Sequence, residues 1–132
     1  MRPVLLDTCI LIDYLNGISP AADTLKEYAE NSAISVITWM EVMVGAFRMN
    51  HEQQQITRRF LARFTQLPVN EAVAELAVAI RAQRGIKLPD AIIDATAQVE
   101  NRLLLTRNVK DFKNIPGVIF PYTVDDEENR AR

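Results

Sequence analysis

The stretch of sequence that decides the expected fold is Val4-Leu5-Leu6-Asp7-Thr8-Cys9. Three apolar residues in a row are typical of a short strand buried on both faces, as central strands of parallel sheets are. The run stops at a carboxylate, Asp7. Helical spacing follows at once, with Ile10, Leu11 and Tyr14 on one face. A buried strand that ends in an acid and leads into a helix predicts an α/β domain with a ligand site at that strand end.

Strand and helix patterns alternate along the rest of the chain. Further strands are predicted at 33–37, 66–69, 103–105 and 118–120, and helices opening at 19, 38, 51, 70, 89 and 108. The predicted N-caps are Thr8, Thr38, Asn70 and Asn108. Pro68 marks its strand as an edge, because proline cannot donate to a sheet ladder. Alternation implies right-handed crossovers between parallel strands, so we expect a three-layer α/β/α sandwich with a small central parallel sheet.

Length and composition fit one compact domain. A chain of 132 residues buries roughly two-thirds of its unfolded surface, so residues 1–124 are expected to form a single domain. The only cysteine, Cys9, excludes an internal disulfide, and no Cys/His cluster suits zinc. No signal-peptide layout and no apolar run of about 20 residues is present, which favours a cytoplasmic protein without a membrane segment. The charged stretch 125–132 is predicted to be a flexible tail.

Carboxylates stand where the apolar runs stop. They are Asp7, Glu41, Asp90, Asp94 and Asp111. The carboxyl ends of parallel strands border one crevice, so acids from distant segments can meet there. Asp90 and Asp94 lie four residues apart on a helix, about 6 Å from each other, and unit charges at that separation repel by around 3 kcal/mol. A divalent cation would remove that repulsion, which favours Mg²⁺ or Mn²⁺ and a phosphodiesterase acting on RNA.

The net charge of −2 is unusual for a nucleic-acid enzyme, because contact with phosphates usually leaves a basic footprint. Part of the negative charge belongs to the predicted metal site and part to the stretch after 125. Arginines between 48 and 63 and basic residues between 81 and 87 are concentrated on two helical regions. Such side chains fit solvated helix faces as well as RNA contacts.

Four motifs, in order, resemble one known family. They are Leu6-Asp7-Thr8-Cys9, Thr38-Trp39-Met40-Glu41-Val42 with Gly45, Leu88-Pro89-Asp90-Ala91-Ile92-Ile93-Asp94-Ala95-Thr96-Ala97, and Leu105-Thr106-Arg107-Asn108-Val109-Lys110-Asp111-Phe112. Together they resemble the PIN-domain ribonucleases, specifically the VapC-type toxins of bacterial toxin–antitoxin pairs, over about residues 3–120. The resemblance implies a PIN-like fold, Mg²⁺- or Mn²⁺-dependent RNA cleavage, dimerisation and inhibition by a VapB-like antitoxin.

The resemblance also implies site residues. The family's catalytic acids fall on Asp7, Glu41, Asp90 and Asp111, with Asp94 as an additional acid, and its polar site residues on Thr8, Thr106 and Asn108. The expected metal ligands are Asp7, Asp90, Asp94 and Asp111. Cys9 departs from the asparagine or serine common in relatives, and we expect it to be a small packed residue. The expected reaction is hydrolysis of an RNA phosphodiester by metal-activated water, and the sequence leaves open whether Glu41 binds metal through water or orients the nucleophile.

Alternatives from other classes remain at this stage. A receiver-like phosphotransfer domain has a similar length and acidic pocket but needs paired acids after the first strand, and a haloacid-dehalogenase-like phosphatase needs an acid where Cys9 stands. An interaction module with a structural cation is the third alternative.

The helix after residue 38 is expected to turn Val42, Val44 and Phe47 toward the core. Surplus apolar residues there (Trp39, Met40, Met43, Phe47 and Met49) predict a homodimer and an antitoxin bound near that helix.

Overall fold

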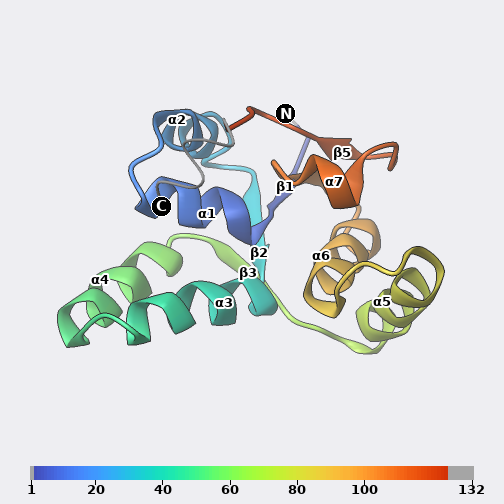
Figure 1. Ribbon diagram of the computed structural model, residues 1–132, viewed down its shortest axis with the longest axis horizontal. Coiled ribbons are helices and arrows are strands. Elements are labelled where there is room, and N and C mark those ends of the chain that lie inside the picture. Colours follow the sequence, from blue (N-terminus) through green and yellow to red (C-terminus); the bar gives the residue numbers. More distant parts are fainter. Residues whose placement is uncertain (1, 125–132) are drawn as a thin grey trace.

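The computed structural model describes residues 2–124 and shows a parallel sheet between two groups of helices (Figure 1). The strands are β1 (Val4–Leu6), β2 (Ser32–Ser35), β3 (Thr65–Leu67), β4 (Leu103–Leu105) and β5 (Val118–Ile119). They form one five-stranded sheet in the order β3-β2-β1-β4-β5, with every neighbouring pair parallel. The predicted edge strand lies at the edge, and β1 lies in the middle.

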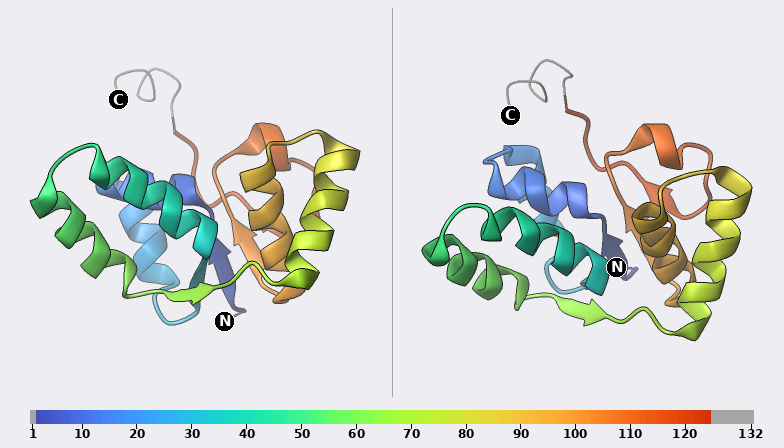
Figure 2. Two further views of the ribbon diagram at one scale, coloured as in Figure 1. Left: turned by 90° about the horizontal axis from the view of Figure 1, so that it is seen from below. Right: turned by 60° about the horizontal axis from the view of Figure 1, so that its bottom comes forward.

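The helices cover both faces of this sheet. They are α1 (Thr8–Leu15), α2 (Ser19–Glu27), α3 (Val36–Phe47), α4 (His51–Leu61), α5 (Glu71–Arg84), α6 (Leu88–Val99) and the short α7 (Val109–Phe112). Figure 2 shows α1 to α4 gathered on one side of the sheet and α5 and α6 on the other. The expected three-layer α/β/α architecture is therefore confirmed.

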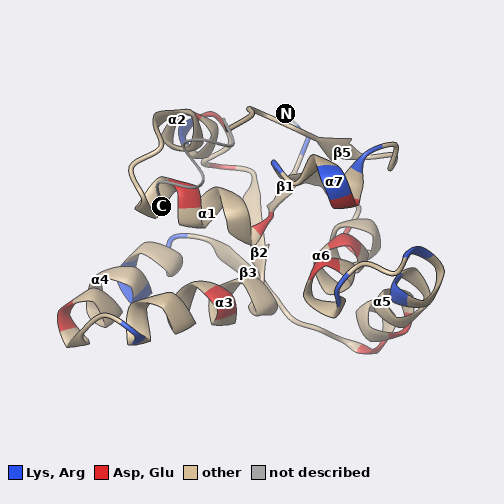
Figure 3. Cartoon of the chain, in the orientation of Figure 1, with Lys and Arg blue, Asp and Glu red and all other residues tan. Residues whose placement is uncertain are grey.

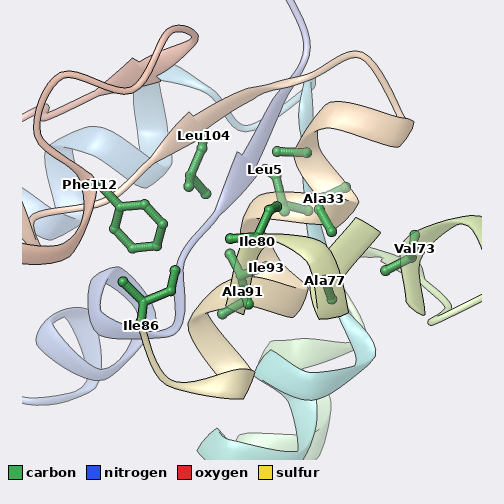
Figure 4. Close-up of a cluster of buried hydrophobic side chains, with 12 residues drawn as sticks. Leu5, Ala33, Val73, Ala77, Ile80, Ile86, Ala91, Ile93, Leu104 and Phe112 are labelled. Atoms are coloured by element: carbon green, nitrogen blue, oxygen red, sulfur yellow. The ribbon is translucent and has the colours of Figure 1, made fainter. Parts of the chain in front are cut away.

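Strand alternation divides the core into two clusters. Leu5 and Leu104 point toward α5 and α6, where they pack with Ile80, Ile93 and, from α7, Phe112 (Figure 4). The neighbouring strand residues Val4, Leu6 and Leu105 point the other way and pack against α1, α3 and α4. All three residues of β1 are fully buried. A strand enclosed on both faces holds the residue that follows it in a fixed place, and that residue is Asp7.

The strand order reverses between β1 and β4, which are neighbours in the sheet although far apart in sequence. At such a switch point the connections that follow the two strands leave the sheet in different directions and open a crevice at its carboxyl edge. The backbone N–H of Asp7 donates to the carbonyl of Leu105 over 2.9 Å, so Asp7 and the start of the β4–α7 connection are adjacent. The sheet topology therefore brings the first and last predicted site motifs together.

Two predicted helix starts differ from the observed ones. Asp7, rather than Thr8, is the N-cap of α1, and its carboxylate accepts from the Thr8 backbone N–H. Likewise β2 ends at Ser35, whose hydroxyl caps α3 by accepting from the backbone N–H of Ile37 at 3.1 Å. Thr38 therefore lies inside α3, and Glu41 lies in its second turn instead of near its start.

The predicted caps Asn70 and Asn108 are confirmed, each accepting from a backbone N–H three residues on. The predicted flexible tail, 125–132, lies outside the described residues. Within the described part, no helix combines the length and apolarity that crossing a bilayer requires.

Candidate acidic active site

Asp7 is the innermost acid of the predicted site. Its side chain is nearly inaccessible, with the residue 3% exposed. Its Oδ1 accepts from the Thr8 backbone N–H at 2.8 Å, and its Oδ2 accepts from the Thr106 hydroxyl at 2.6 Å. Burial raises the pKa of Asp7, while the hydrogen bonds, that from Thr106 first, act to lower it. Asp7 is thus held by the start of α1 through Thr8 and by the residue after β4, Thr106.

Glu41 reaches the same region from α3. The Thr8 hydroxyl donates to Glu41 Oε1 at 2.7 Å, and the Thr38 hydroxyl lies 2.9 Å from that of Thr8. A hydroxyl has one proton, so Thr38 donates to Thr8 while Thr8 donates to Glu41. The two threonines fix the orientation of the Glu41 carboxylate. The sequence predicted Glu41 at the site, but it predicted Thr38 only as a helix cap.

The third component is the segment of residues 106 to 111, which follows β4 and runs into α7. We call it the 106–111 segment. The Thr106 hydroxyl accepts from the Asn108 backbone N–H at 3.0 Å while donating to Asp7. The Asn108 side chain donates to Asp111 Oδ2 at 3.0 Å and accepts from the Asp111 backbone N–H at 3.3 Å. Asn108 therefore caps α7 and orients the Asp111 carboxylate with one amide group.

Asp90 lies in the first turn of α6, and its pKa is affected by the other acids. Its pKa is raised to about 7, first by burial and then by the negative charge of Asp7, by a hydrogen bond to Asp111 and by the charges of Asp111 and Glu41. Asp7, Glu41 and Asp111 therefore lie near enough to Asp90 for their charges to raise its pKa. Figure 3 shows the acidic positions of α3, α6 and α7 arranged around the end of β1. Among residues 2–124, none of these four carboxylates forms a salt bridge.

The donor chemistry of this pocket suits a hard cation, since it offers carboxylate oxygens and no nearby histidine. Within the described residues, no three His, Cys, Asp or Glu side chains lie close enough to share a metal ion as they stand. Asp7, Glu41 and Asp111 each accept a hydrogen bond from a neighbouring hydroxyl, amide or backbone N–H group. The raised pKa of Asp90 indicates negative charge that no cationic side chain in the described structure balances. The residues present therefore fit a cation, which would draw the carboxylates inward.

Asp94, which was also predicted as a metal ligand, has different partners in the structure from the other four acids. Its Oδ2 accepts from Arg84, and its Oδ1 accepts from the Gln98 side chain at 3.0 Å. One helical turn beyond Asp90, it is 2% exposed and pairs with the end of α5. The spacing of four residues placed the two acids on one side of α6, but both carboxylate oxygens of Asp94 are occupied by Arg84 and Gln98.

Three residues near the site were missed by sequence reasoning. Asp13 on α1 is 2% exposed and accepts from Arg107 at both carboxylate oxygens and from the Tyr122 hydroxyl. One sequence signal did exist. Asp13 lies three residues after Ile10, on the buried face of α1, and a charged residue on such a face needs a partner.

Cys9 and His51 are unsuited to catalysis. Burial, with the charge of Asp7 second, raises the pKa of the Cys9 thiol to about 12, so it is protonated at neutral pH. The only histidine, His51, is exposed at the start of α4. The hydrogen-bond partners of the Cys9 thiol are Asp7 and Thr106, and His51 is not among them. The expectation that Cys9 is a packed residue is confirmed.

Fold and site together define a class of protein, a three-layer α/β/α domain with an acidic centre at the carboxyl ends of its parallel strands. Residues 4–118 match the family model of the PIN domain. Ribonuclease VapC10 of Mycobacterium tuberculosis is 31% identical to this chain, over 97% of this chain and 99% of that protein. The chain belongs to the PIN-domain family and, within it, to the VapC type. The phosphotransfer and phosphatase alternatives are thereby set aside.

Solved structures give the same result. A toxin–antitoxin complex from Klebsiella pneumoniae contains a chain that is 48% identical, with a TM-score of 0.86, covering 92% of this chain and 99% of that one. VapBC2 from Rickettsia felis, bound to a DNA fragment from its promoter, matches at 29% identity and a TM-score of 0.74, over 92% and 98% of the two chains.

Proposed function

We propose that this protein is a metal-dependent endoribonuclease that acts as the toxin of a type II toxin–antitoxin pair. The observation that carries the proposal is the hydrogen-bond network beside the carboxyl end of β1, in which Thr106 holds Asp7, Thr8 holds Glu41 and Asn108 holds Asp111 at the switch point of the sheet. Relatives named ribonucleases and a similar chain in a toxin–antitoxin complex support it.

The roles of the residues follow from how each is held. Asp7, Asp90 and Asp111 would hold Mg²⁺ or Mn²⁺. When bound, the ion supplies positive charge against the reacting phosphodiester and lowers the pKa of a water molecule. Glu41, whose carboxylate is oriented by the Thr8 hydroxyl, would orient the attacking water and accept its proton. Thr106 and Asn108 keep Asp7 and Asp111 in position.

RNA is the proposed substrate, and a basic groove beside the site supports this. Arg84, Lys110 and Lys113 line a groove together with Asp111. Lys110 and Lys113 are exposed, so their ammonium groups can neutralise phosphates on either side of the cut. The net charge of −2 includes the four site carboxylates, so it does not oppose RNA binding at this groove.

Incubation of the purified protein with a labelled RNA tests the function directly. We expect cleavage in Mn²⁺ or Mg²⁺, none in EDTA, and no 2′,3′-cyclic phosphate ends, because water rather than the 2′-hydroxyl attacks. An Asp111→Asn variant serves as the inactive control. Cleavage that persists in EDTA, or wild-type protein without any cleavage of cellular RNA, would contradict the proposal.

An antitoxin is the proposed partner, and an apolar groove next to Glu41 offers the binding surface. Ile12, Leu15 and Met49 line this groove and are 39%, 43% and 65% exposed. An apolar segment lying here would end at the acidic pocket, where a basic side chain would meet unbalanced carboxylates. This arrangement agrees with the predicted antitoxin position near α3.

Placing a charge in that groove should therefore weaken the complex. We expect Met49→Lys to lower the affinity for the cognate VapB-like antitoxin at least tenfold while RNA cleavage is kept, since none of the hydrogen bonds that hold Asp7, Glu41 and Asp111 involves Met49. Isothermal titration measures the change. The matched control is Val78→Lys, which introduces the same charge at an exposed apolar position of α5. Equal affinities for the two variants would show that the antitoxin binds elsewhere.

A homodimer is proposed from the remaining apolar surface of α3. Val44 and Phe47, expected to face the core, are 49% and 56% exposed, whereas Val42 and Met43 are buried. The core prediction was wrong for these two because α3 packs along one narrow stripe. Met40 is exposed as well, and the Arg58 guanidinium lies 5.9 Å from the Phe47 ring centre. A second copy of this chain would cover this apolar surface.

A further inference from the structure

We propose that Arg107 and Arg84 are positioning residues of the acidic site, each fixing one end of the 106–111 segment through a buried carboxylate. The inference rests on the proposed function, because it assigns these arginines a part in cation binding. Residues 2–124 contain two salt bridges, Asp13–Arg107 and Asp94–Arg84, and both attach to this one segment. Neither pair contacts the pocket's own carboxylates.

The first pair fastens the start of the segment to α1. Arg107 donates from Nε to one oxygen of Asp13 and from Nη2 to the other, at 3.1 Å for the second bond. This bidentate contact fixes both the place and the orientation of the guanidinium plane. The hydrogen bond that Arg107 donates to Asp13 raises the pKa of Arg107, so the guanidinium stays charged. The neighbours of Arg107 in sequence are Thr106 and Asn108, the two residues that hold Asp7 and Asp111.

The second pair fastens the end of the segment to α5 and α6. Asp94 holds Arg84 from one side, and Arg84 Nη2 donates to the backbone carbonyl of Asp111 at 2.8 Å. The guanidinium also lies 5.7 Å from the ring centre of Phe112, which is fully buried. Arg84 therefore acts directly on the backbone of a site acid. This gives Asp94 a role that its burial alone does not explain.

The segment needs such external restraints because its internal bonds are local. Asn108 fixes Asp111 relative to itself, but a single four-residue helix has little stability of its own. Asp111 must also approach Asp90 and Asp7, which repel it. Metal ligands lie about 2 to 2.6 Å from their ion, so a shift of the segment by about 1 Å would remove one ligand. The two ion pairs hold the segment from opposite sides of the switch point.

A general contribution to stability would not account for this placement. Buried ion pairs contribute little net stability compared with well-packed apolar residues, because charges lose their hydration on burial. What they provide is a fixed geometry. Here that geometry is imposed on the segment that carries one site acid and the residues that orient two.

The test uses full-length Arg107→Gln and Arg84→Gln, with Lys26→Gln as a control that removes one exposed positive charge from α2. Isothermal titration with Mn²⁺ alone should show affinity lowered about 10–100-fold in the first two variants and unchanged in the control, as for other groups that orient metal ligands. In the metal-free proteins, amide hydrogen exchange of residues 106–112 should accelerate at least tenfold in the same two variants. At saturating Mn²⁺, kcat should fall more than KM for RNA rises.

A double variant separates positioning from stability. Arg107→Gln alone leaves the buried Asp13 carboxylate without its cationic partner, so the Tm of this variant falls. Asp13→Asn combined with Arg107→Gln removes both charges and should recover most of the Tm but not the Mn²⁺ affinity. Recovery of affinity together with Tm, or exchange rates equal to wild type, would overturn the proposal. Wild-type protein that fails to bind Mn²⁺ would instead contradict the proposed function, and hydrogen exchange would still report whether the arginines hold the segment.

Discussion

Replacing Asp7 by asparagine is expected to abolish RNA cleavage and to leave the fold intact. The amide has the shape of the carboxylate and keeps an oxygen for the Thr8 backbone N–H, and the Thr106 hydroxyl can accept from the new NH₂ group. The negative charge at the centre of the pocket is lost, however. Loss of a direct ligand should exceed the roughly 10–100-fold reduction typical of groups that only orient ligands. Initial rates of Mn²⁺-dependent cleavage measure the effect.

The matched control for that experiment is Asp23→Asn, which neutralises an exposed aspartate on α2 and should leave the rate unchanged. Circular dichroism and Tm check that both variants are folded. Asp7→Asn protein that is free of contaminating nuclease and still cleaves RNA at a similar rate would refute the assignment of Asp7.

The metal-free protein is expected to lose stability as the pH rises from about 4 to about 7. The pKa of Asp90 is raised from 3.8 to about 7 in the folded state, so between these values the native state binds more protons than the unfolded state. Stability must then fall with rising pH until Asp90 is ionised. The full shift corresponds to about 4 kcal/mol, but Asp90 is partly exposed and solvent screening reduces this to roughly 1–2 kcal/mol. Urea unfolding in EDTA at pH 5 and pH 8 measures the difference.

The same reasoning gives Asp90→Asn two opposite effects. The variant should lose RNA cleavage, yet in EDTA at pH 8 it should be more stable than the wild type. A first-turn acid gains about 0.3–1 kcal/mol from the helix dipole, which the substitution removes, so relief of repulsion has to exceed that amount. Glu75→Gln, at an exposed position of α5, serves as the control without repulsive neighbours in the pocket. If Asp90→Asn were less stable than wild type at pH 8, the pocket would not be strained by its charges.

Local sequence signals were sufficient for most of the fold. The apolar run before Asp7 predicted the buried central strand, and Asn70 and Asn108 predicted helix starts. The strand predicted at 66–69 does lie at the edge, but it runs over Thr65–Leu67, so Pro68 follows the strand instead of lying in it. The start of α3 was misplaced because Ser35 and Thr38 are both good caps and only tertiary packing selects between them. Strand ends are equally sensitive to packing, since each strand here has two to four residues.

The candidate site was less accessible to sequence reasoning, because its supporting contacts are long-range. Asp13 and Arg107 are 94 residues apart, and Asp13 and Tyr122 are 109 apart, so no local pattern links them. The partner of Asp94 was missed for a related reason. Helical spacing gives the face on which a side chain lies, but it does not show that Arg84, ten residues earlier, pairs with Asp94.

The position of β1 has a consequence for the timing of synthesis. This strand is made first, but one of its edges stays unpaired until β4 is made, nearly a hundred residues later. A nascent chain, growing at about 5–20 residues per second, therefore carries Asp7 for several seconds before Thr106, Asn108 and Asp111 exist. Nascent chains that end before residue 111 lack a complete acidic centre, so RNA cleavage by this protein has to wait until the 106–111 segment has been made.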